Sequence, residues 1–298
     1  MSTLSTSAHR KAPVALTRWV TAHPLVTFFV LAYAITWGIV GGAMLAVGSG
    51  TMTEDSPLVA TLLQLYSFGP AFAALIAAAA TAGWRGLRDV LGSLDPRRIG
   101  LGWYPLVLVT PPLALALAEA VFFGAAPLVG LAEQWPLIFT VYLLPVLTTV
   151  LLTTGIAEEL GWRGFAQPRL QARYGPLAGS LILGAAAALW HLPNAVLGSG
   201  GLPIFALQVV VVIMMVVLGN WFYNHNRGSV LIVALFHAAI NTSGKLVAPL
   251  LPITDRALLQ QHVWMVTLTI MSLVTLVLII VTRGRLGLAP GSDDHVLP

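Results

Sequence analysis

Residues 174–226 read YGPLAGSLILGAAAALWHLPNAVLGSGGLPIFALQVVVVIMMVVLGNWFYNHN, a run of 53 residues that contains no Asp, Glu, Lys or Arg. A helix that crosses the hydrocarbon core of a bilayer needs roughly 20 mostly apolar residues. This run is therefore long enough for two crossings. The turn residues near its middle, Gly198-Ser199-Gly200-Gly201-Leu202-Pro203, are expected to join the two helices.

Shorter uncharged runs lie on both sides of this one, and each is long enough for about one crossing. They cover Trp19 to Thr53, Ser56 to Trp84, Ile99 to Ala118, Gln134 to Ala157, Gly228 to Gly244 and Ala257 to Thr282. Together with the two crossings above, they predict an all-α protein, a polytopic membrane bundle of eight transmembrane helices.

The composition of the whole chain agrees with this fold class. Hydrophobic residues make up 57% of the 298 residues and charged residues only 9%, whereas a soluble domain carries about 25% charge. The mean hydropathy is +0.87. We expect a single membrane domain over residues 24–283, with its motif-bearing core at 143–246, and cytosolic tails at 1–23 and 284–298.

The distribution of Lys and Arg predicts the orientation, because cytoplasmic loops are enriched in these residues. With eight crossings and both termini cytoplasmic, thirteen basic residues fall inside, and only Lys245 and Arg256 fall outside. We expect a multi-pass protein of the cell membrane. The net charge of +4 then follows from topology and implies no nucleic-acid partner. Because there is no cysteine, thiol nucleophiles and thiolate metal ligands are excluded.

Ionisable side chains are costly inside a bilayer, so each one in or beside a span is a candidate functional residue. The candidates are Glu119, Glu158, Glu159, Arg163, His191 and His237. Glu119 lies near the predicted outer end of the third helix, where we expect it to reach interfacial water.

The segment Glu158-Glu159-Leu160-Gly161-Trp162-Arg163 closes the fourth apolar run. Helical spacing directs the two carboxylates to faces about 100° apart, so they are expected to have different roles. Glu159 and Arg163 stand at i and i+4 and can form an ion pair. Glu158 is then free to face a cavity. The alternative is a solvated, charged helix end at the membrane boundary.

Two histidines lie in later apolar runs. His191 stands in Trp190-His191-Leu192-Pro193, and His237 precedes Asn241 by one helical turn, which places imidazole and carboxamide on one face. His191 is interpreted either as a functional group or as a packing group. The pair His237 and Asn241 either binds a substrate carbonyl or holds helices together by hydrogen bonds.

One carboxylate and two imidazoles on three helices each need a partner in a medium without water, and convergence on one site supplies it. A carboxylate beside imidazoles can take a proton from water. The same three side chains, Glu158, His191 and His237, are also a possible set of ligands for a divalent metal such as zinc. The residues alone leave both possibilities open.

In these motifs the chain resembles the CAAX-processing and bacteriocin-processing (CPBP, or Abi) family of intramembrane endopeptidases. The matching positions are the family's Glu-Glu-x-x-x-Arg at Glu158, Glu159 and Arg163, its second-motif histidine at His191, and its His-x-x-x-Asn at His237 and Asn241. One position departs from the family pattern. Ala187 stands where the second motif usually carries an aromatic residue, which bears on the shape of the pocket.

The resemblance implies an intramembrane peptidase that hydrolyses a peptide bond in a membrane-associated or lipidated peptide or protein, in a cavity open toward the cytosol. It implies that Glu158 and His191 activate the attacking water and that His237 and Asn241 stabilise the oxyanion. Glu159 and Arg163 would support them. No cofactor is favoured, since Asn241 is a poor zinc ligand, although a metallo-type site with zinc stays possible.

These roles require Glu158 and His191 to lie at a similar depth. If the fifth helix starts at Pro176, its rise of about 1.5 Å per residue places His191 some 22 Å along it. We therefore expect the fourth helix to continue past Glu158 to about Gln167, just before Pro168, and the fifth to begin below the membrane surface.

Two other functions compete with proteolysis. A proton-coupled transporter would use Glu119, Glu158 and the histidines as a relay, but the chain lacks the two related halves that such transporters typically have. A non-catalytic membrane scaffold or immunity protein would have the same fold without turnover.

Overall fold

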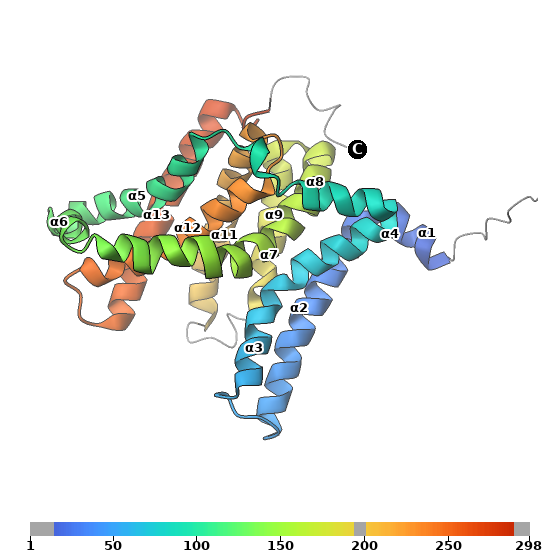
Figure 1. Cartoon of the computed structure of the whole chain (residues 1–298), viewed down its shortest axis with the longest axis horizontal. Coiled ribbons are helices and arrows are strands. Elements are labelled where there is room, and N and C mark those ends of the chain that lie inside the picture. Colours follow the sequence, from blue (N-terminus) through green and yellow to red (C-terminus); the bar gives the residue numbers. More distant parts are fainter. Residues whose placement is uncertain (1–14, 194–200, 289–298) are drawn as a thin grey trace, which may run out of the picture.

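The computed structural model describes residues 15–193 and 201–288, and all regular structure within these ranges is helical (Figure 1). The principal helices are α1 (Ala15–Ala22), α2 (Pro24–Gly48), α3 (Pro57–Leu65), α4 (Gly69–Gly92), α5 (Trp103–Phe123), α6 (Ala126–Glu133), α7 (Ala157–Gly161), α8 (Gln167–Tyr174), α9 (Pro176–Trp190), α11 (Gly201–His225), α12 (Val230–Val247) and α13 (Arg256–Thr282). The predicted all-α class is confirmed.

The described residues contain six helices that are long and apolar enough to cross a membrane. A seventh crossing results if α6 and the helix that follows it, which meet at 91°, form one bent span. The predicted number of eight is therefore not confirmed. The remaining candidate, α9, has only 15 residues, or about 22 Å of helix, against roughly 30 Å of hydrocarbon.

The turn expected between the fifth and sixth helices lies only partly within the described residues. Gly198, Ser199 and Gly200 are outside them, whereas Gly201, Leu202 and Pro203 form the start of α11. The crossing that the sequence predicts around α9 therefore ends, as far as it is described, just after His191.

The second span has a break where its apolar stretch ends. Helices α3 and α4 follow each other across a short 3₁₀ turn, and Gly83 inside α4 has φ 59° and ψ −141°, a conformation available to glycine but rarely to other residues. The next residues, Trp84 and Arg85, begin the amphipathic part of α4. The glycine thus separates an apolar span from a polar extension.

A continuous helical stretch from Ile138 to Tyr174 carries the first motif. It includes the π-helical segments Ile138–Leu143, Val146–Ile156 and Trp162–Ala166, with α7 and α8 between and after them. The expectation that this helix passes Glu158 is confirmed, but the stop before Pro168 is wrong. After the wide π turn, Pro168 stands in the first turn of α8, where a missing N–H removes no hydrogen bond.

Several basic loops gather at one end of the molecule, which we call the basic end. There the backbone N–H of Val230 donates to Ser93 O (2.8 Å), the Arg98 guanidinium donates to Arg227 O (3.1 Å) and the Asn224 amide donates to Leu286 O (2.8 Å). These contacts bring together the loops after α4, α11 and α13. Helices that cross the membrane in alternating directions would place these three loops on the same side.

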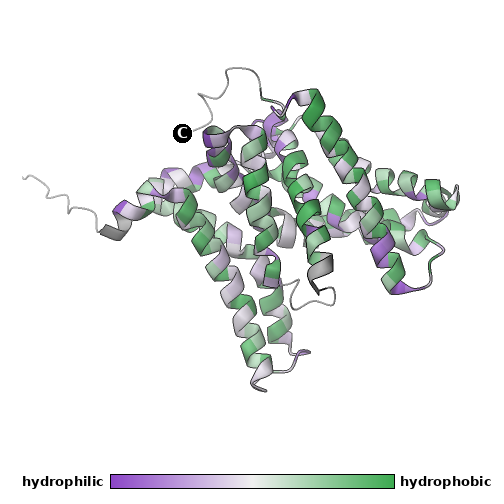
Figure 2. Ribbon diagram, turned by 180° about the vertical axis from the view of Figure 1, so that it is seen from behind, coloured by the Kyte–Doolittle hydropathy of each residue, from purple (hydrophilic) through white to green (hydrophobic). Residues whose placement is uncertain are grey.

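The helix surfaces are consistent with a lipid environment. Figure 2 shows long hydrophobic stretches on the outside of the helices. On α13, Leu273, Ile280 and Val281 are 60%, 65% and 75% exposed, and most of its apolar length is not buried by other helices. A helix that is hydrophobic on its exposed side is expected to face lipid rather than water.

The expectation for Glu119 is wrong. Its side chain is fully buried instead of reaching interfacial water, and Oε2 lies 2.7 Å from Nε2 of His262 on α13. The aromatic rings of Phe122 and Phe123 pack on His262. Glu119 therefore ties α5 to α13. The partner was not evident in the sequence because the two residues are 143 positions apart.

Candidate active site

The two adjacent glutamates of α7 are both buried, with exposed fractions of 3% for Glu158 and 1% for Glu159. Two glycines allow their helix to approach its neighbours closely. A Cβ on Gly155 would lie 2.8 Å from the carbonyl oxygen of Ala234 on α12, and a Cβ on Gly161 would overlap Pro70 at the start of α4. The glutamates are thus held between α12 and α4.

Glu159 contacts two different partners. Its Oε2 lies 2.5 Å from Nη1 of Arg163, the ion pair that the i, i+4 spacing predicts, and its Oε1 lies 2.8 Å from Nδ1 of His237 on α12. All three side chains are buried. The contact with His237 was not predicted, and it joins the first motif directly to the third. We call this group the Arg163–Glu159–His237 triad.

The triad restricts what His237 can do. A carboxylate only accepts hydrogen bonds, so Nδ1 of His237 carries the hydrogen in the contact with Glu159. In the neutral ring Nε2 is then an acceptor, and it becomes a donor only when the imidazole is protonated.

A cavity of about 660 Å³ brings the other motif residues together. Glu158, His191, His237 and Asn241 all line it, so the predicted convergence of three helices on one space agrees with the structure. Glu158 reaches this cavity while Glu159, next to it in the chain, is engaged in the triad. The two carboxylates therefore differ in their surroundings as their helical positions suggest.

His191 follows the last residue of α9, and its backbone N–H donates to Ala188 O at 3.1 Å. The neighbouring Trp190 is buried and packs against Tyr66, Trp162 and the His191 ring itself, with ring centroids 5.5, 5.8 and 4.7 Å apart. Ala187 is buried one turn earlier. The aromatic wall beside His191 is thus built from Trp190 and its partners.

The geometry of the described residues bears on the predicted alternative, a divalent metal held by Glu158, His191 and His237. Within residues 15–193 and 201–288, no three His, Asp or Glu side chains are grouped as metal ligands. Glu158, His191 and His237 share the cavity wall, and the hydrogen bond from Nδ1 of His237 to Glu159 leaves Nε2 as the acceptor of the neutral ring. The described arrangement does not gather them as a three-ligand site.

The cavity also has polar lining residues that the sequence motifs did not indicate: Tyr66, Gln208, Lys245, Arg256 and Gln260. Lys245 follows Asn241 by four residues. Extending the i, i+4 spacing of His237 and Asn241 by one more turn would therefore have predicted it. Arg256 and Gln260 belong to α13 and are brought in only by the tertiary fold.

The exposed part of the cavity lining lies away from the basic end. Asn241 and Lys245 in the last turns of α12 and Arg256 and Gln260 in the first turns of α13 are exposed. The basic end lies at the opposite ends of the same two helices. The charge distribution predicts that the basic end is cytosolic, and the family resemblance implies that the cavity opens toward the cytosol. Because the exposed lining lies away from the basic end, these two expectations cannot both hold.

Comparison with known proteins gives two matches. Residues 139–243 match the family model described as Type II CAAX prenyl endopeptidase Rce1-like, and this range contains all six motif residues. CAAX prenyl protease 2 of Methanococcus maripaludis is 33% identical over 118 residues, which are 37% of this chain and 43% of that protein. The similarity thus spans less than half of the relative's length.

Proposed function

We propose that this chain, which belongs to the CAAX protease (CPBP) family, is an intramembrane endopeptidase that hydrolyses a peptide bond with a water molecule activated by Glu158. The observation that carries the proposal is that the two adjacent carboxylates have different surroundings. Glu159 is engaged by Arg163 and His237, whereas Glu158 lines the cavity that also contains His191, His237 and Asn241.

In the proposed reaction, Glu158 accepts a proton from water while the water oxygen attacks the peptide carbonyl carbon. His191, which follows α9 and lines the same cavity, orients this water. The proton then passes from Glu158 to the leaving nitrogen as the carbon–nitrogen bond breaks, which yields a carboxylic acid and an amine. General acid–base catalysis of this kind contributes typically about 10² to 10⁴-fold.

The negative charge on the carbonyl oxygen is stabilised in this mechanism by His237 and Asn241. Asn241 supplies amide N–H donors, and His237 supplies Nε2–H when its ring is protonated. Glu159 supports this form because it accepts from Nδ1 at 2.8 Å. Asn241 acts without any change of protonation, so the two donors differ in their dependence on pH.

We infer a metal-free reaction from the same donors, because a carboxamide suits an oxyanion hole better than a metal shell. The test is to measure turnover and bound zinc in one preparation, before and after chelation. Turnover that persists in zinc-free protein is expected. Stoichiometric zinc that is lost together with activity, and restores it, would contradict the metal-free mechanism.

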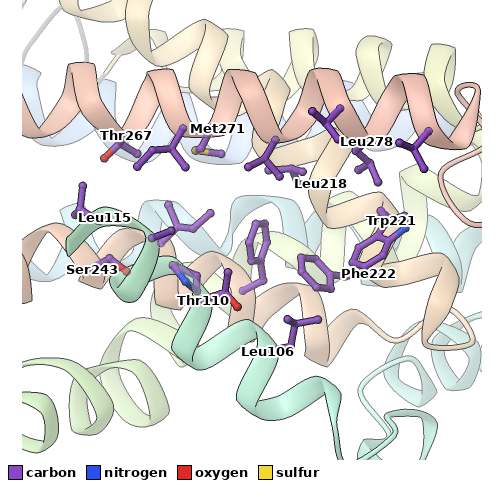
Figure 3. A pocket seen from close by; sticks show the side chains of 18 residues that line it. Leu106, Thr110, Leu115, Leu218, Trp221, Phe222, Ser243, Thr267, Met271 and Leu278 are labelled. Atoms are coloured by element: carbon purple, nitrogen blue, oxygen red, sulfur yellow. The ribbon is translucent and has the colours of Figure 1, made fainter. Parts of the chain in front are cut away.

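The proposed substrate is a membrane-embedded peptide or protein that carries a hydrocarbon chain, as the prenyl proteases named above suggest. A second, apolar cavity of about 400 Å³ supports this class (Figure 3). Leu106 and Leu115 of α5, Phe222 of α11 and Leu278 of α13 point into it, and it shares Ile240 and Thr267 with the polar cavity. A lipid chain in one cavity therefore places its attached peptide near the other.

The decisive experiment compares purified wild type with Glu158→Gln in a cleavage assay on lipidated and unlipidated peptides in vesicles. Glu158→Gln keeps the size and polarity of the side chain but removes the base, so we expect turnover to be lost while thermal unfolding is unchanged. Glu133→Gln, at an exposed position on α6, is the matched control. Equal cleavage by Glu158→Gln and wild type would refute the assignment, and no cleavage by either would favour the scaffold.

A further inference from the structure

The helix that carries Glu159 continues its polar face beyond the triad. Glu159, Arg163, Gln167 and Gln171 follow one another at every fourth position, and a helical side chain four residues on returns to nearly the same face. Their exposed fractions are only 1%, 1%, 0% and 5%. These side chains therefore form one buried row, which we call the polar row, and the proposed mechanism uses only its first two members.

Helix α11 approaches the polar row at two adjacent residues, Gly219 and Asn220. Gly219 allows a close approach, since a Cβ there would lie 3.0 Å from Nη2 of Arg163. The side-chain amide of Asn220 donates to Oε1 of Gln171 at 2.9 Å. Adjacent residues of α11 thus contact the two neighbours of Gln167 in the row, which places Gln167 against α11 between these contacts.

Polar atoms that lack a partner gather where α11 meets the polar row. Within residues 15–193 and 201–288, no hydrogen-bond partner is found for Nε and Nη2 of Arg163, for either amide atom of Gln167, or for Oδ1 of Asn220. All three side chains are buried. Buried polar groups are paired with protein or with ordered water in the large majority of cases. These atoms therefore indicate a bound ligand between the polar row and α11.

The chemistry of these atoms identifies the ligand as water. Nε and Nη2 of Arg163 and Nε2 of Gln167 are donors, whereas Oε1 of Gln167 and Oδ1 of Asn220 are acceptors. Glu159 already balances the charge of Arg163 at 2.5 Å, so the site has no surplus charge for an anion. A small neutral molecule that both donates and accepts is required, and a buried water typically makes about three such hydrogen bonds.

We propose that Arg163, Gln167 and Asn220 bind a cluster of buried water molecules, and that this cluster makes Gln167 a positioning residue for the reaction. This inference rests on the proposed function. Water bonded to Nε and Nη2 holds the guanidinium of Arg163, which in turn contacts Oε2 of Glu159. Oε1 of Glu159 then holds Nδ1 of His237. The orientation of the imidazole in the cavity thus depends on Gln167, which touches no substrate.

The first experiment detects the water without using turnover. In protein labelled with ¹⁵N-arginine in detergent micelles, the Nε–H signal of Arg163 is assigned by its loss in Arg163→Lys. We expect a cross-peak between this N–H and water in the wild type. It should disappear in Gln167→Leu, because leucine keeps a similar volume but has no polar atom. A wild type without the cross-peak, or a cross-peak that Gln167→Leu leaves unchanged, would overturn the water site.

The second experiment separates positioning from a structural role by measuring kcat and KM for peptide cleavage. We expect Gln167→Leu to reduce kcat about 10- to 10²-fold with little change in KM, since a misplacement of about 1 Å can cost about 10²-fold in rate. Gln167→Asn should retain most of the turnover, because an additional water can replace the missing methylene group. Thr242→Val removes a buried hydroxyl that is bonded within α12, and as the matched control it should leave kcat unchanged.

Thermal unfolding in detergent completes the test. A lower unfolding temperature with unchanged kcat in Gln167→Leu would make Gln167 a packing residue and overturn its positioning role, and so would equal losses of turnover in Gln167→Leu and Gln167→Asn. If Gln167→Leu does not fold, Gln167→Asn decides, because both the water cross-peak and most of the turnover should persist in it. A wild type that gives the cross-peak but cleaves no peptide would confirm the water site and refute the proposed function together with the positioning role.

Discussion

Glu158 and Glu159 are neighbours in the chain but differ in what they contact. Glu159 is held by Arg163 and His237 at 2.5 and 2.8 Å, and Glu158 lies at the cavity wall. The ion pair with Arg163 was predictable because it depends only on helical spacing. The contact with His237, 78 residues away, depends on how α12 packs and was not.

Removing Arg163 should destabilise the protein strongly, because Glu159 would keep a buried charge with one partner fewer. Breaking a buried pair costs about 3–5 kcal/mol. We expect Arg163→Ala to lower the thermal unfolding temperature in detergent. Arg85→Ala is the contrast, because Arg85 and Asp89 form an i, i+4 pair that is exposed and contributes about 0.5 kcal/mol or less. Equal effects of the two substitutions would contradict the importance of burial.

Asn241→Ala should reduce kcat about 10² to 10³-fold, the range for loss of one oxyanion donor, with little change in KM. Asn241→Asp is the informative companion, because it keeps the size and removes the N–H donors. Both variants should fail alike in a steady-state cleavage assay. If Asn241→Asp retains turnover, Asn241 does not donate to the oxyanion.

At the scale of elements, the helix that carries Glu158 and Glu159 packs closely against the backbones of two neighbouring helices. No charge pattern in the sequence reveals these contacts. Gly155 meets Ala234 of α12 and Gly161 meets Pro70 of α4. The depth argument predicted that the helix continues past Glu158. It did not predict the π-helical turns that carry the helix through Pro168, because these follow from packing rather than from residue preference.

Gly161→Ala should destabilise the packing of α7 on α4, because the added methyl group would overlap the backbone and ring of Pro70. Overpacking of this kind costs typically about 1–3 kcal/mol. Gly164→Ala, three residues later, is the control, since its Cβ would meet neighbouring atoms at an ordinary 3.5 Å. Thermal unfolding of the two variants decides the matter, and a Gly161→Ala variant as stable as Gly164→Ala would show that α4 can move aside.

The pair formed by Glu119 and His262 should hold α5 against α13. His262→Ala leaves the buried carboxylate without this partner, at a cost of about 1–3 kcal/mol. Adding Glu119→Gln to His262→Ala removes the charge and should recover part of the loss in thermal unfolding. If the double variant is no more stable than His262→Ala alone, the carboxylate is not charged or not dependent on the histidine.

At the scale of the whole molecule, the hydrophobic pattern predicted the positions of the helices better than their number. The run from Trp19 to Thr53 contains α2, and the run from Ala257 to Thr282 covers α13 except for its first residue, Arg256. Eight full crossings do not follow, because α9 is short and α6 meets the next helix at 91°. Neither feature changes the hydrophobicity of the sequence, so composition could not reveal it.

The basic end is expected to be cytosolic, which can be tested with reporters fused after Pro298 and inserted at Met52. The C-terminal reporter should behave as cytosolic and the Met52 reporter, between α2 and α3, as external. The cavity would then open on the external side, near Lys245 and Arg256. The opposite pair of signals would place the cavity mouth in the cytosol and contradict the charge rule for this chain.

The order of synthesis gives the triad a further consequence. Glu159 and Arg163 leave the ribosome close together, whereas His237 follows Glu159 by 78 residues, about 4–16 s later at usual translation rates of about 5–20 residues per second. During that interval the i, i+4 pair can neutralise itself within one nascent helix as it meets the lipid. His237 then joins a pre-formed pair when α12 packs against the helix that carries Glu159.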